Sequence, residues 1–296
     1  MTREKEILMR SLLFVPGHID KYMHSALTSK ADVLLPDVED SVPTEADKKT
    51  AVKNIVQFAE SGKFKNLQVF PRVDLDFNYP VLNKLAIPGI TGFMIPKVKN
   101  AFDVREMNAR LSVIERNTNV RYGTYKLIPL IETAAAVLHA EEISRASERV
   151  IALAFGSEDY LSEITGLGVR DETSFATARA WISIAAKAAG ILAIDTVNTN
   201  VFDIEVLNKK CKEARCLGYD GSLILHPVEI EHVHRWFSPS EEEMELARDI
   251  IKKSEEAKKK GKGVAIINNR FVGPPMVASA KNMIEKHKLI QKNKRQ

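Results

Sequence analysis

The sequence places acidic side chains within or directly after short apolar runs, where several carboxylates could act together. These residues are Asp37, Glu39, Asp40, Glu132, Glu158, Asp159 and Asp195. Carboxylates in apolar surroundings are costly unless a cation pairs with them or a metal ion binds them. Only two cationic residues, Arg72 and Lys97, stand at comparable positions, which is too few to neutralise the set. We therefore predict a hard divalent cation that prefers oxygen ligands, such as Mg2+.

Two of these carboxylates are the best candidates for metal ligands. Glu132 and Asp159 end successive apolar runs, and neighbouring strands lie about 4.8 Å apart, so both could bind one ion. Arg72 could then hold a substrate carboxylate, because a guanidinium group binds a carboxylate through two hydrogen bonds. Any single member of the set could instead cap a helix or form a loop salt bridge. The occurrence of the whole set at the ends of apolar runs favours a site.

Eight apolar runs supply the elements that must position these side chains. They span residues 11–17, 32–40, 67–74, 92–98, 126–133, 150–159, 191–197 and 221–227. Most are continuously apolar, which is typical of strands buried on both faces of a parallel sheet, and helical stretches separate them. Eight strand–helix units predict a (β/α)8 TIM barrel with its active site at the carboxyl ends of the strands. A doubly wound open sheet is the alternative, but no G-x-G-x-x-G motif follows the first run.

Two of the stretches between the runs show a helical pattern, namely 101–116 and 134–146. The pattern changes after Pro227. Residues 238–261 indicate a helix with an acidic first turn and lysines near its end. A strand-like segment at 264–272, a Gly-Pro-Pro break and a last helix to about residue 290 are expected to follow.

We predict two parts, a barrel over 1–236 and a C-terminal helical extension over 237–296 that serves as a lid or an oligomer arm. The extension is basic: segments 252–262 and 281–296 together carry twelve Lys or Arg against three Glu, although the whole chain has a net charge of only +4. We interpret these charges as solvated helix surface, and nucleic acid is not an expected partner.

Composition indicates an ordinary globular protein. Of the 296 residues, 45% are hydrophobic and 28% are charged. The two cysteines, Cys211 and Cys216, fit neither a disulfide framework nor a C-x-x-C site. No apolar run approaches the roughly 18 residues of a membrane helix, and residues 1–10 lack a signal-peptide core. We expect a cytoplasmic protein with no membrane partner.

Short motifs along the chain occur in an order that resembles a known family. They are RSLLFVPG (10–17), DVEDSV (37–42), FPRVD (70–74), IPKV (95–98), PLIET (129–133), FGSEDY (155–160), GYDGSLILHP (218–227) and NNRFVGPP (268–275). This ordered set resembles citrate lyase beta-subunit-like proteins of the HpcH/HpaI aldolase superfamily, whose relatives include malyl-CoA and citramalyl-CoA lyases. The resemblance covers almost the whole chain.

The resemblance implies a catalytic site built from the acidic set. Mg2+ would bind through Glu132 and Asp159, and Arg72 would act on the substrate carboxylate. Glu39 and Asp40 match acidic family positions beside the metal, which makes them candidates for proton transfer or for positioning. In the family the metal chelates a keto acid, such as pyruvate, glyoxylate or oxaloacetate, and the other fragment leaves as the enolate of an acyl thioester.

The resemblance also implies sites for the rest of the substrate. Backbone amides near Gly156 and Ser157 would help to hold the acid. Lys21 and Lys48 are candidates to bind the carrier of the acyl group, either CoA or an acyl-carrier protein. A homo-oligomer, a trimer or a hexamer, is expected.

Some positions depart from the family pattern. Ser25 and Val52 stand where family members commonly have Lys and Arg, and Gly273 stands where they usually have Asp. We predict an Mg2+-dependent carbon–carbon lyase that cleaves a malyl-, citramalyl- or citryl-type thioester to a keto acid and an acyl thioester. The departures leave two alternatives open, namely a metal-dependent aldolase on a free hydroxy or keto acid and a non-catalytic binding or assembly subunit.

Overall fold

The computed structural model describes residues 7–74, 79–165, 173–259, 261, 264–267 and 270–293. The chain divides into two compact units, residues 1–234 and residues 235–296. The first unit holds the parallel strands and every candidate site residue except Gly273.

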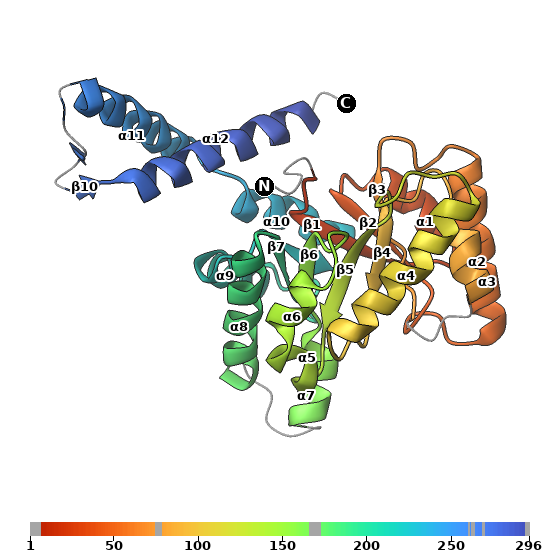
Figure 1. Ribbon diagram of the computed structural model, residues 1–296. Helices are drawn as coiled ribbons and strands as arrows, with labels where there is room; N and C mark the ends of the chain where they lie inside the picture. The colour runs from red at the N-terminus through yellow and green to blue at the C-terminus, as the bar shows by residue number, and fades with distance from the viewer. Residues whose placement is uncertain are drawn as a thin grey trace. The chain divides into compact units, whose positions relative to one another are not determined.

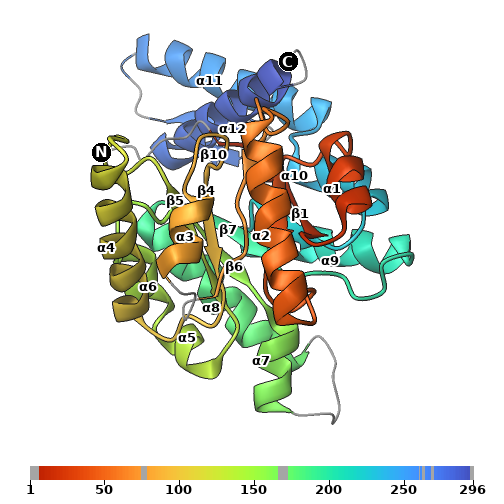
Figure 2. The same cartoon turned by 90° about the vertical axis from the view of Figure 1, so that its right-hand side faces the viewer.

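Eight parallel strands form the centre of the first unit, with helices around them in both views (Figure 1 and Figure 2). They are β1 (Ser11–Pro16), β2 (Val33–Asp37), β3 (Gln68–Val69), β4 (Gly92–Ile95), β5 (Lys126–Ile131), β6 (Ala152–Phe155), β7 (Leu192–Asp195) and β8 (Gly221–Ile224). Their order around the sheet is β3-β2-β1-β8-β7-β6-β5-β4. Each of the eight apolar runs thus contains one strand.

The sheet closes beyond the short strand β3. Arg72 forms parallel bridges to Asp37 on one side and to Met94 on the other. The amide of Val73 donates to the Met94 carbonyl at 3.0 Å, and the amide of Met94 donates to the Pro71 carbonyl at 3.0 Å. The predicted (β/α)8 barrel is confirmed, and Arg72 lies on the seam that closes it.

The barrel interior explains why the runs are continuously apolar, since strands buried on both faces need apolar side chains at every position. Its central cluster contains Met9, Leu12, Val33, Leu35, Phe70, Met94, Ile128, Leu130, Ala152, Ala154, Ile194 and Leu223, each at most 2% exposed. The interior is therefore a packed core, and polar chemistry is confined to the ends of the strands.

Helices follow the strands and cover the barrel. They are α1 (Asp20–Leu27), α2 (Glu45–Glu60), α3 (Tyr79–Leu85), α4 (Ala101–Asn117), α5 (Ala134–Leu138), α6 (Ala140–Arg145), α7 (Ser157–Ile164), α8 (Thr173–Ala189), α9 (Ile204–Leu217) and α10 (Ile230–Phe237), with a 3-10 turn at Pro227–Glu229. Asn100 begins α4 with a capping box, and Thr44, Thr133 and Asp203 cap α2, α5 and α9. The stretch 134–146 was predicted as one helix but forms two, joined at His139.

Buried ion pairs lie at the amino ends of the strands. Arg149, which precedes β6, pairs with Glu115 at 2.6 Å, and both side chains are 1% exposed. Arg10, which precedes β1, binds Asp32 through two nitrogens at 2.8 Å each. Glu115 and Asp32 therefore each have a guanidinium partner, and such complete pairs hold elements together.

The second unit contains α11 (Glu241–Lys259), a two-stranded antiparallel ribbon of β9 (Ala265–Ile267) and β10 (Arg270–Val272), and α12 (Pro274–Asn293). A single strand-like segment was expected at 264–272, so the ribbon is an additional feature. The expected break at Gly-Pro-Pro begins a helix instead, because Pro is well suited to the first turn. A small apolar core of Ala247, Ile250, Val272 and Ala280 joins the elements.

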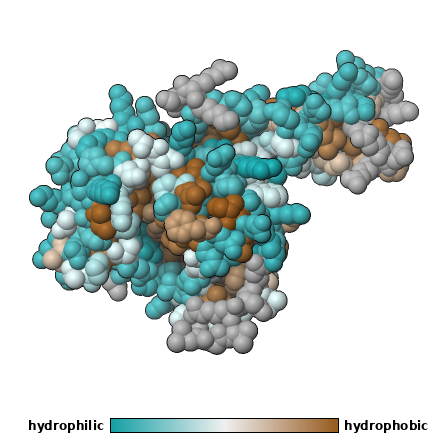
Figure 3. Space-filling view, turned by 180° about the vertical axis from the view of Figure 1, so that it is seen from behind, coloured by the Kyte–Doolittle hydropathy of each residue, from teal (hydrophilic) through white to brown (hydrophobic). Residues whose placement is uncertain are grey.

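The surface is mainly hydrophilic when seen from behind, with apolar side chains gathered in a few patches (Figure 3). Exposed apolar residues include Trp181 and Ile184 of α8 and Phe202 before α9. Among the described residues, no helix combines the length and the apolar character that crossing a membrane requires.

Candidate functional site

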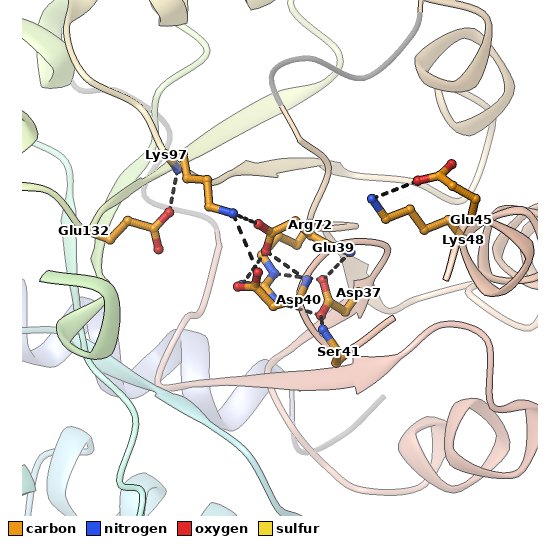
Figure 4. Close-up of polar contacts among 9 residues, drawn as sticks. All are labelled: Asp37, Glu39, Asp40, Ser41, Glu45, Lys48, Arg72, Lys97 and Glu132. Carbon is orange, nitrogen blue, oxygen red and sulfur yellow. Dashed lines mark hydrogen bonds and ion pairs between the residues drawn. The ribbon is translucent and has the colours of Figure 1, made fainter. Parts of the chain in front are cut away.

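Arg72 is the centre of a buried cluster of carboxylates at the carboxyl ends of β2 and β3 (Figure 4). Its Nε and Nη2 donate to the two oxygens of Asp37 at 2.8 and 2.6 Å. Its Nη1 donates to Asp40 at 3.0 Å and lies 3.1 Å from Glu39 Oε2. The Arg72 side chain is 9% exposed and that of Asp40 is 51% exposed. Only the Nη1 side of the guanidinium group therefore faces a partner that solvent reaches.

The charges in this cluster set its protonation. Burial alone raises the pKa of Asp37, but the hydrogen bonds and charge of Arg72 outweigh burial and hold that pKa below its ordinary value. Burial together with the neighbouring Asp40 raises the pKa of Glu39, although Lys97 and Arg72 oppose the shift. Asp37 is thus a fixed anion, and Glu39 is a more basic carboxylate than an ordinary Glu.

Lys97 connects this cluster to Glu132 (Figure 4). Its ammonium group pairs with Glu39 and lies 3.6 Å from Asp40. Its backbone amide donates to Glu132 Oε1 at 2.5 Å. The prediction counted Lys97 among the cations and gave it no further role, because a sequence does not show where a backbone amide points.

Glu132 follows β5 and is only 2% exposed, and its charge is poorly compensated. Burial raises the pKa of Glu132 to about 8, and the charges of Asp159 and Glu39 add to this, while the Lys97 amide and Arg72 oppose it. A bound cation would favour the ionised form of such a carboxylate. Glu132 therefore fits a metal ligand better than it fits a structural ion pair.

Asp159 lies in the first turn of α7 and shares a cavity of about 620 Å3 with Glu132. The cavity is lined by Asp74, Lys97, Lys99, Asp103, Glu106, Arg110, Glu132, Thr133, Asp159 and Glu163. Throughout the described ranges, no three Asp, Glu, His or Cys side chains form a metal-binding cluster. Mg2+ commonly binds one or two carboxylates and completes its octahedron with water and substrate, so Glu132 and Asp159 are compatible with that ion.

The amides of Gly156 and Ser157 already have partners inside the protein. Gly156 donates to the Ile131 carbonyl at 2.9 Å, and Ser157 donates to Thr196 Oγ1 at 3.1 Å. The Ser157 hydroxyl also lies 2.6 Å from Thr196 Oγ1. These two amides are thus engaged in joining β6 to β5 and β7, and the expected substrate contact through them has no support in this geometry.

Glycine at 156 has a steric role beside Glu132. A Cβ atom at this position would lie 2.7 Å from Glu132 Cβ and 2.8 Å from Glu132 Oε2. Such distances are too short for ordinary contacts, so only a glycine leaves room for the carboxylate. The structure therefore places Gly156 against the candidate metal ligand.

The predicted carrier residues lie apart from the cavity. Lys21 is exposed in the first turn of α1, and Lys48 on α2 lies 3.3 Å from Glu45 (Figure 4). Neither lysine lines the cavity that contains Glu132 and Asp159. Gly273 belongs to the second unit, where, among the described residues, a Cβ would meet Pro275 alone, at 3.8 Å.

The remaining members of the acidic set differ from the metal pair. Asp195 ends β7 and binds Arg179 of α8 through two hydrogen bonds of 2.9 and 2.6 Å. The prediction counted Asp195 as a carboxylate without a cation and missed Arg179, whose place inside a helical stretch gave no sign of its partner. Glu158 is exposed on α7 and does not line the cavity.

Comparisons with known proteins agree over nearly the whole chain. A family model described as HpcH/HpaI aldolase/citrate lyase matches residues 10–227. Citrate lyase subunit beta of Haemophilus influenzae is 31% identical over 284 residues, covering 95% of this chain and 97% of that protein. A (3S)-malyl-CoA thioesterase of Cereibacter sphaeroides is 26% identical over 283 residues, covering 95% of both proteins.

A solved structure shows the same architecture. The citrate lyase beta subunit from M. tuberculosis, complexed with oxaloacetate and magnesium, superimposes with a TM-score of 0.66 at 25% sequence identity. The match covers 79% of this chain and 99% of that chain. The family model, the two relatives and the solved structure therefore point to one family of barrel proteins.

Proposed function

The chain belongs to the HpcH/HpaI aldolase/citrate lyase family, and we propose that it is an Mg2+-dependent carbon–carbon lyase. Its substrate would be a β-hydroxy acyl thioester of the malyl, citramalyl or citryl type, and its products a keto acid and an acyl thioester. One observation carries the proposal: Glu132 is buried with a pKa of about 8 and shares a cavity with Asp159. The magnesium and oxaloacetate of the M. tuberculosis relative add support.

Glu132 and Asp159 would hold the ion. Mg2+ would supply Lewis-acid polarisation of the oxygen on the carbon that becomes the keto group. Arg72 would bind the substrate carboxylate through Nη1, since its Nε and Nη2 are taken by Asp37. Asp40 contacts Nη1 and its side chain is half-exposed. The substrate carboxylate would replace Asp40 at this nitrogen.

Glu39 is the proposed proton acceptor. It would take the proton of the β-hydroxyl group, the bond between the α- and β-carbons would break, and the keto acid carbonyl would form. The electron pair of that bond would pass to the acyl thioester as its enolate, and the same proton could return to the α-carbon. The raised pKa of Glu39 suits both directions of this transfer.

The thioester and its carrier are the less direct part of the proposal. Lys21 and Lys48 are proposed to bind the carrier because both project cations from the helices that follow β1 and β2. The name of the C. sphaeroides relative supports a CoA thioester in this family. We further propose a cytoplasmic homo-oligomer, and both cysteines being free is compatible with a reducing compartment.

The function can be tested with the purified full chain. Malyl-CoA, citramalyl-CoA and the corresponding free acids would be supplied with Mg2+ or with a chelator, and keto acid release would be measured. We expect release from a thioester in the presence of Mg2+ and none with the chelator. Release from free acids alone would replace the proposal with an aldolase, and no release from any of them would favour a binding subunit.

Gly273 gives a second measurement on the same material. The chain lacks a carboxylate at this position, so we expect acetyl-CoA and glyoxylate to condense without fast release of free CoA. Gly273→Asp has room for its side chain and should increase CoA release. Fast CoA release by the unmodified chain would show that another carboxylate does this work.

A further inference from the structure

The backbone of Lys97 has an uncommon conformation. Its φ is +54°, in the left-handed region that residues with a Cβ atom rarely adopt. Asn66, Asn119 and Lys30 also have positive φ, but none of them lines the cavity. Uncommon backbone conformations of this kind gather at functional sites, where surrounding contacts maintain them.

This conformation places the Lys97 amide on the candidate metal ligand. The amide nitrogen lies 2.5 Å from Glu132 Oε1, and this is a backbone contact that any residue able to adopt the same φ could make. The ammonium group of Lys97 points elsewhere, to Glu39 and Asp40. The main chain and the side chain of Lys97 therefore act on different carboxylates.

The other oxygen of the Glu132 carboxylate, Oε2, lies close to Gly156. A Cβ there would lie 2.8 Å from Oε2, so Oε2 faces this glycine. Gly156 directly precedes α7, and Asp159 lies in the first turn of that helix. One oxygen of Glu132 is thus occupied by Lys97, and the other is directed toward the helix that carries Asp159.

We propose that Lys97 is a positioning residue that orients Glu132 through its backbone amide, with Gly156 as the opposing wall. The amide occupies Oε1 and leaves Oε2 for the ion, so the left-handed backbone of Lys97 supports metal affinity independently of its ammonium group. This inference rests on the proposed role of Glu132 as a metal ligand. Groups that orient metal ligands commonly change metal affinity 10- to 100-fold when they are altered.

A matched pair of substitutions separates the backbone from the side chain. Lys97→Asn and Lys97→Val both remove the ammonium group, but Asn tolerates positive φ and the β-branched Val does not. Mg2+ affinity would be measured by calorimetry on the full chain. We expect Lys97→Val to weaken Mg2+ binding about 10- to 100-fold relative to Lys97→Asn.

Lys30 supplies the control. Its φ of +67° is similar and it lies outside the cavity, so Lys30→Val carries a comparable backbone conflict. Lys30→Val should lower the melting temperature without changing Mg2+ affinity. If Lys97→Val does not fold, Gly156→Ala provides the second test, since its methyl group would displace Glu132 and should also weaken Mg2+ binding.

The outcomes distinguish this inference from the proposed function. Equal Mg2+ affinities in Lys97→Asn and Lys97→Val, or unchanged affinity in Gly156→Ala, would overturn the positioning role. Unchanged affinity in Glu132→Gln, or no Mg2+ binding by the unmodified chain, would overturn the metal site itself. Weaker binding in Lys97→Val and Gly156→Ala, with Lys97→Asn close to the unmodified chain, would support both.

Discussion

Asp37 ends strand β2 and Glu132 follows strand β5 at the same end of the barrel, and the two carboxylates have different neighbours. Asp37 has Arg72 on both oxygens, and its pKa is held below the ordinary value. Glu132 has one backbone amide on Oε1 and carboxylates nearby, and its pKa is raised to about 8. Burial is strong at both residues, but at Asp37 the hydrogen bonds and charge of Arg72 outweigh it, whereas at Glu132 the opposing contacts do not.

The difference separates carboxylates that are paired within the protein from the carboxylate that is the candidate metal ligand. The pair of Asp37 and Arg72 lies on the seam that closes the barrel, and Glu132, which shares a cavity with Asp159, has an unmet need for positive charge. Asp195 on β7 has the same two-hydrogen-bond contact with Arg179, but burial keeps the pKa of Asp195 above its ordinary value. Asp37 and Asp195 thus have guanidinium partners, and Glu132, which has none and shares a cavity with Asp159, is the candidate for an added ion.

The largest effect should come from removing the uncompensated pair. Glu132→Ala or Asp159→Ala should lower turnover of a thioester substrate by at least about a thousandfold, because a catalytic metal supplies several kcal/mol of charge stabilisation. The fold should remain, as circular dichroism would verify. If calorimetry gave unchanged Mg2+ affinity in both variants, neither residue would be a metal ligand. The contrast between Glu132 and Asp37 would then not identify a metal site.

Breaking the Asp37–Arg72 pair should lower the free energy of unfolding. Asp37→Ala leaves the buried Arg72 without its main partner, and we expect a loss of about 3–5 kcal/mol in the free energy of unfolding. Asp40→Ala should cost less than about 1 kcal/mol, since the Asp40 side chain is half-exposed. Urea denaturation of both variants measures the difference. Similar losses of unfolding free energy in the two variants would mean that the Asp37–Arg72 pair does not stabilise the barrel more than Asp40 does.

The pH dependence of stability should identify Glu132. In the metal-free protein the pKa of Glu132 is about 8, above its ordinary value of 4.5. Between these two pH values Glu132 is therefore protonated in the folded state and ionised in the unfolded state. The contribution of Glu132 to stability should therefore fall as pH rises from about 4.5 to 8. Glu132→Gln removes this dependence and should make the metal-free protein more stable at pH 9, by an amount on the order of a few kcal/mol. A Glu132→Gln variant that is less stable than the unmodified chain at pH 9 would contradict the raised pKa of Glu132.

The smallest effect on the site is expected from the basic C-terminal end. Truncation after Glu285 removes Ile290, which is 4% exposed, and should lower the free energy of unfolding by about 1–3 kcal/mol. Pyruvate and glyoxylate affinity with Mg2+ should change by less than about twofold. Loss of keto acid binding after truncation would assign this end a direct part in the site.

Much of this arrangement could be predicted from sequence because burial on both faces of a strand leaves a visible pattern. Each of the eight apolar runs contains a strand, and the acidic residues that follow them, such as Glu39 and Glu132, lie at one end of the barrel. The fold and the neighbourhood of the site follow from that pattern together with the rule that strand ends carry the chemistry.

Pairing and backbone geometry could not be predicted. Arg179 reaches Asp195 from a helix 16 residues earlier in the chain, and Thr196 takes the Ser157 amide across 39 residues, which no local pattern encodes. The left-handed backbone of Lys97 is likewise invisible, since sequence signals for positive φ are strong only for Gly and Asn. The residues that hold the site in position were therefore the ones missed.

The most direct test of the uncompensated carboxylate is the number of protons released when Mg2+ binds. Glu132 with a pKa of about 8 is mostly protonated at pH 7 and must ionise to bind the ion. Calorimetry at pH 7 in buffers of different ionisation enthalpy should give close to one proton released per ion, falling toward zero near pH 9. Glu132→Gln should lose both the binding and the proton release. Mg2+ binding that releases no proton at pH 7, and that Glu132→Gln retains, would contradict the account.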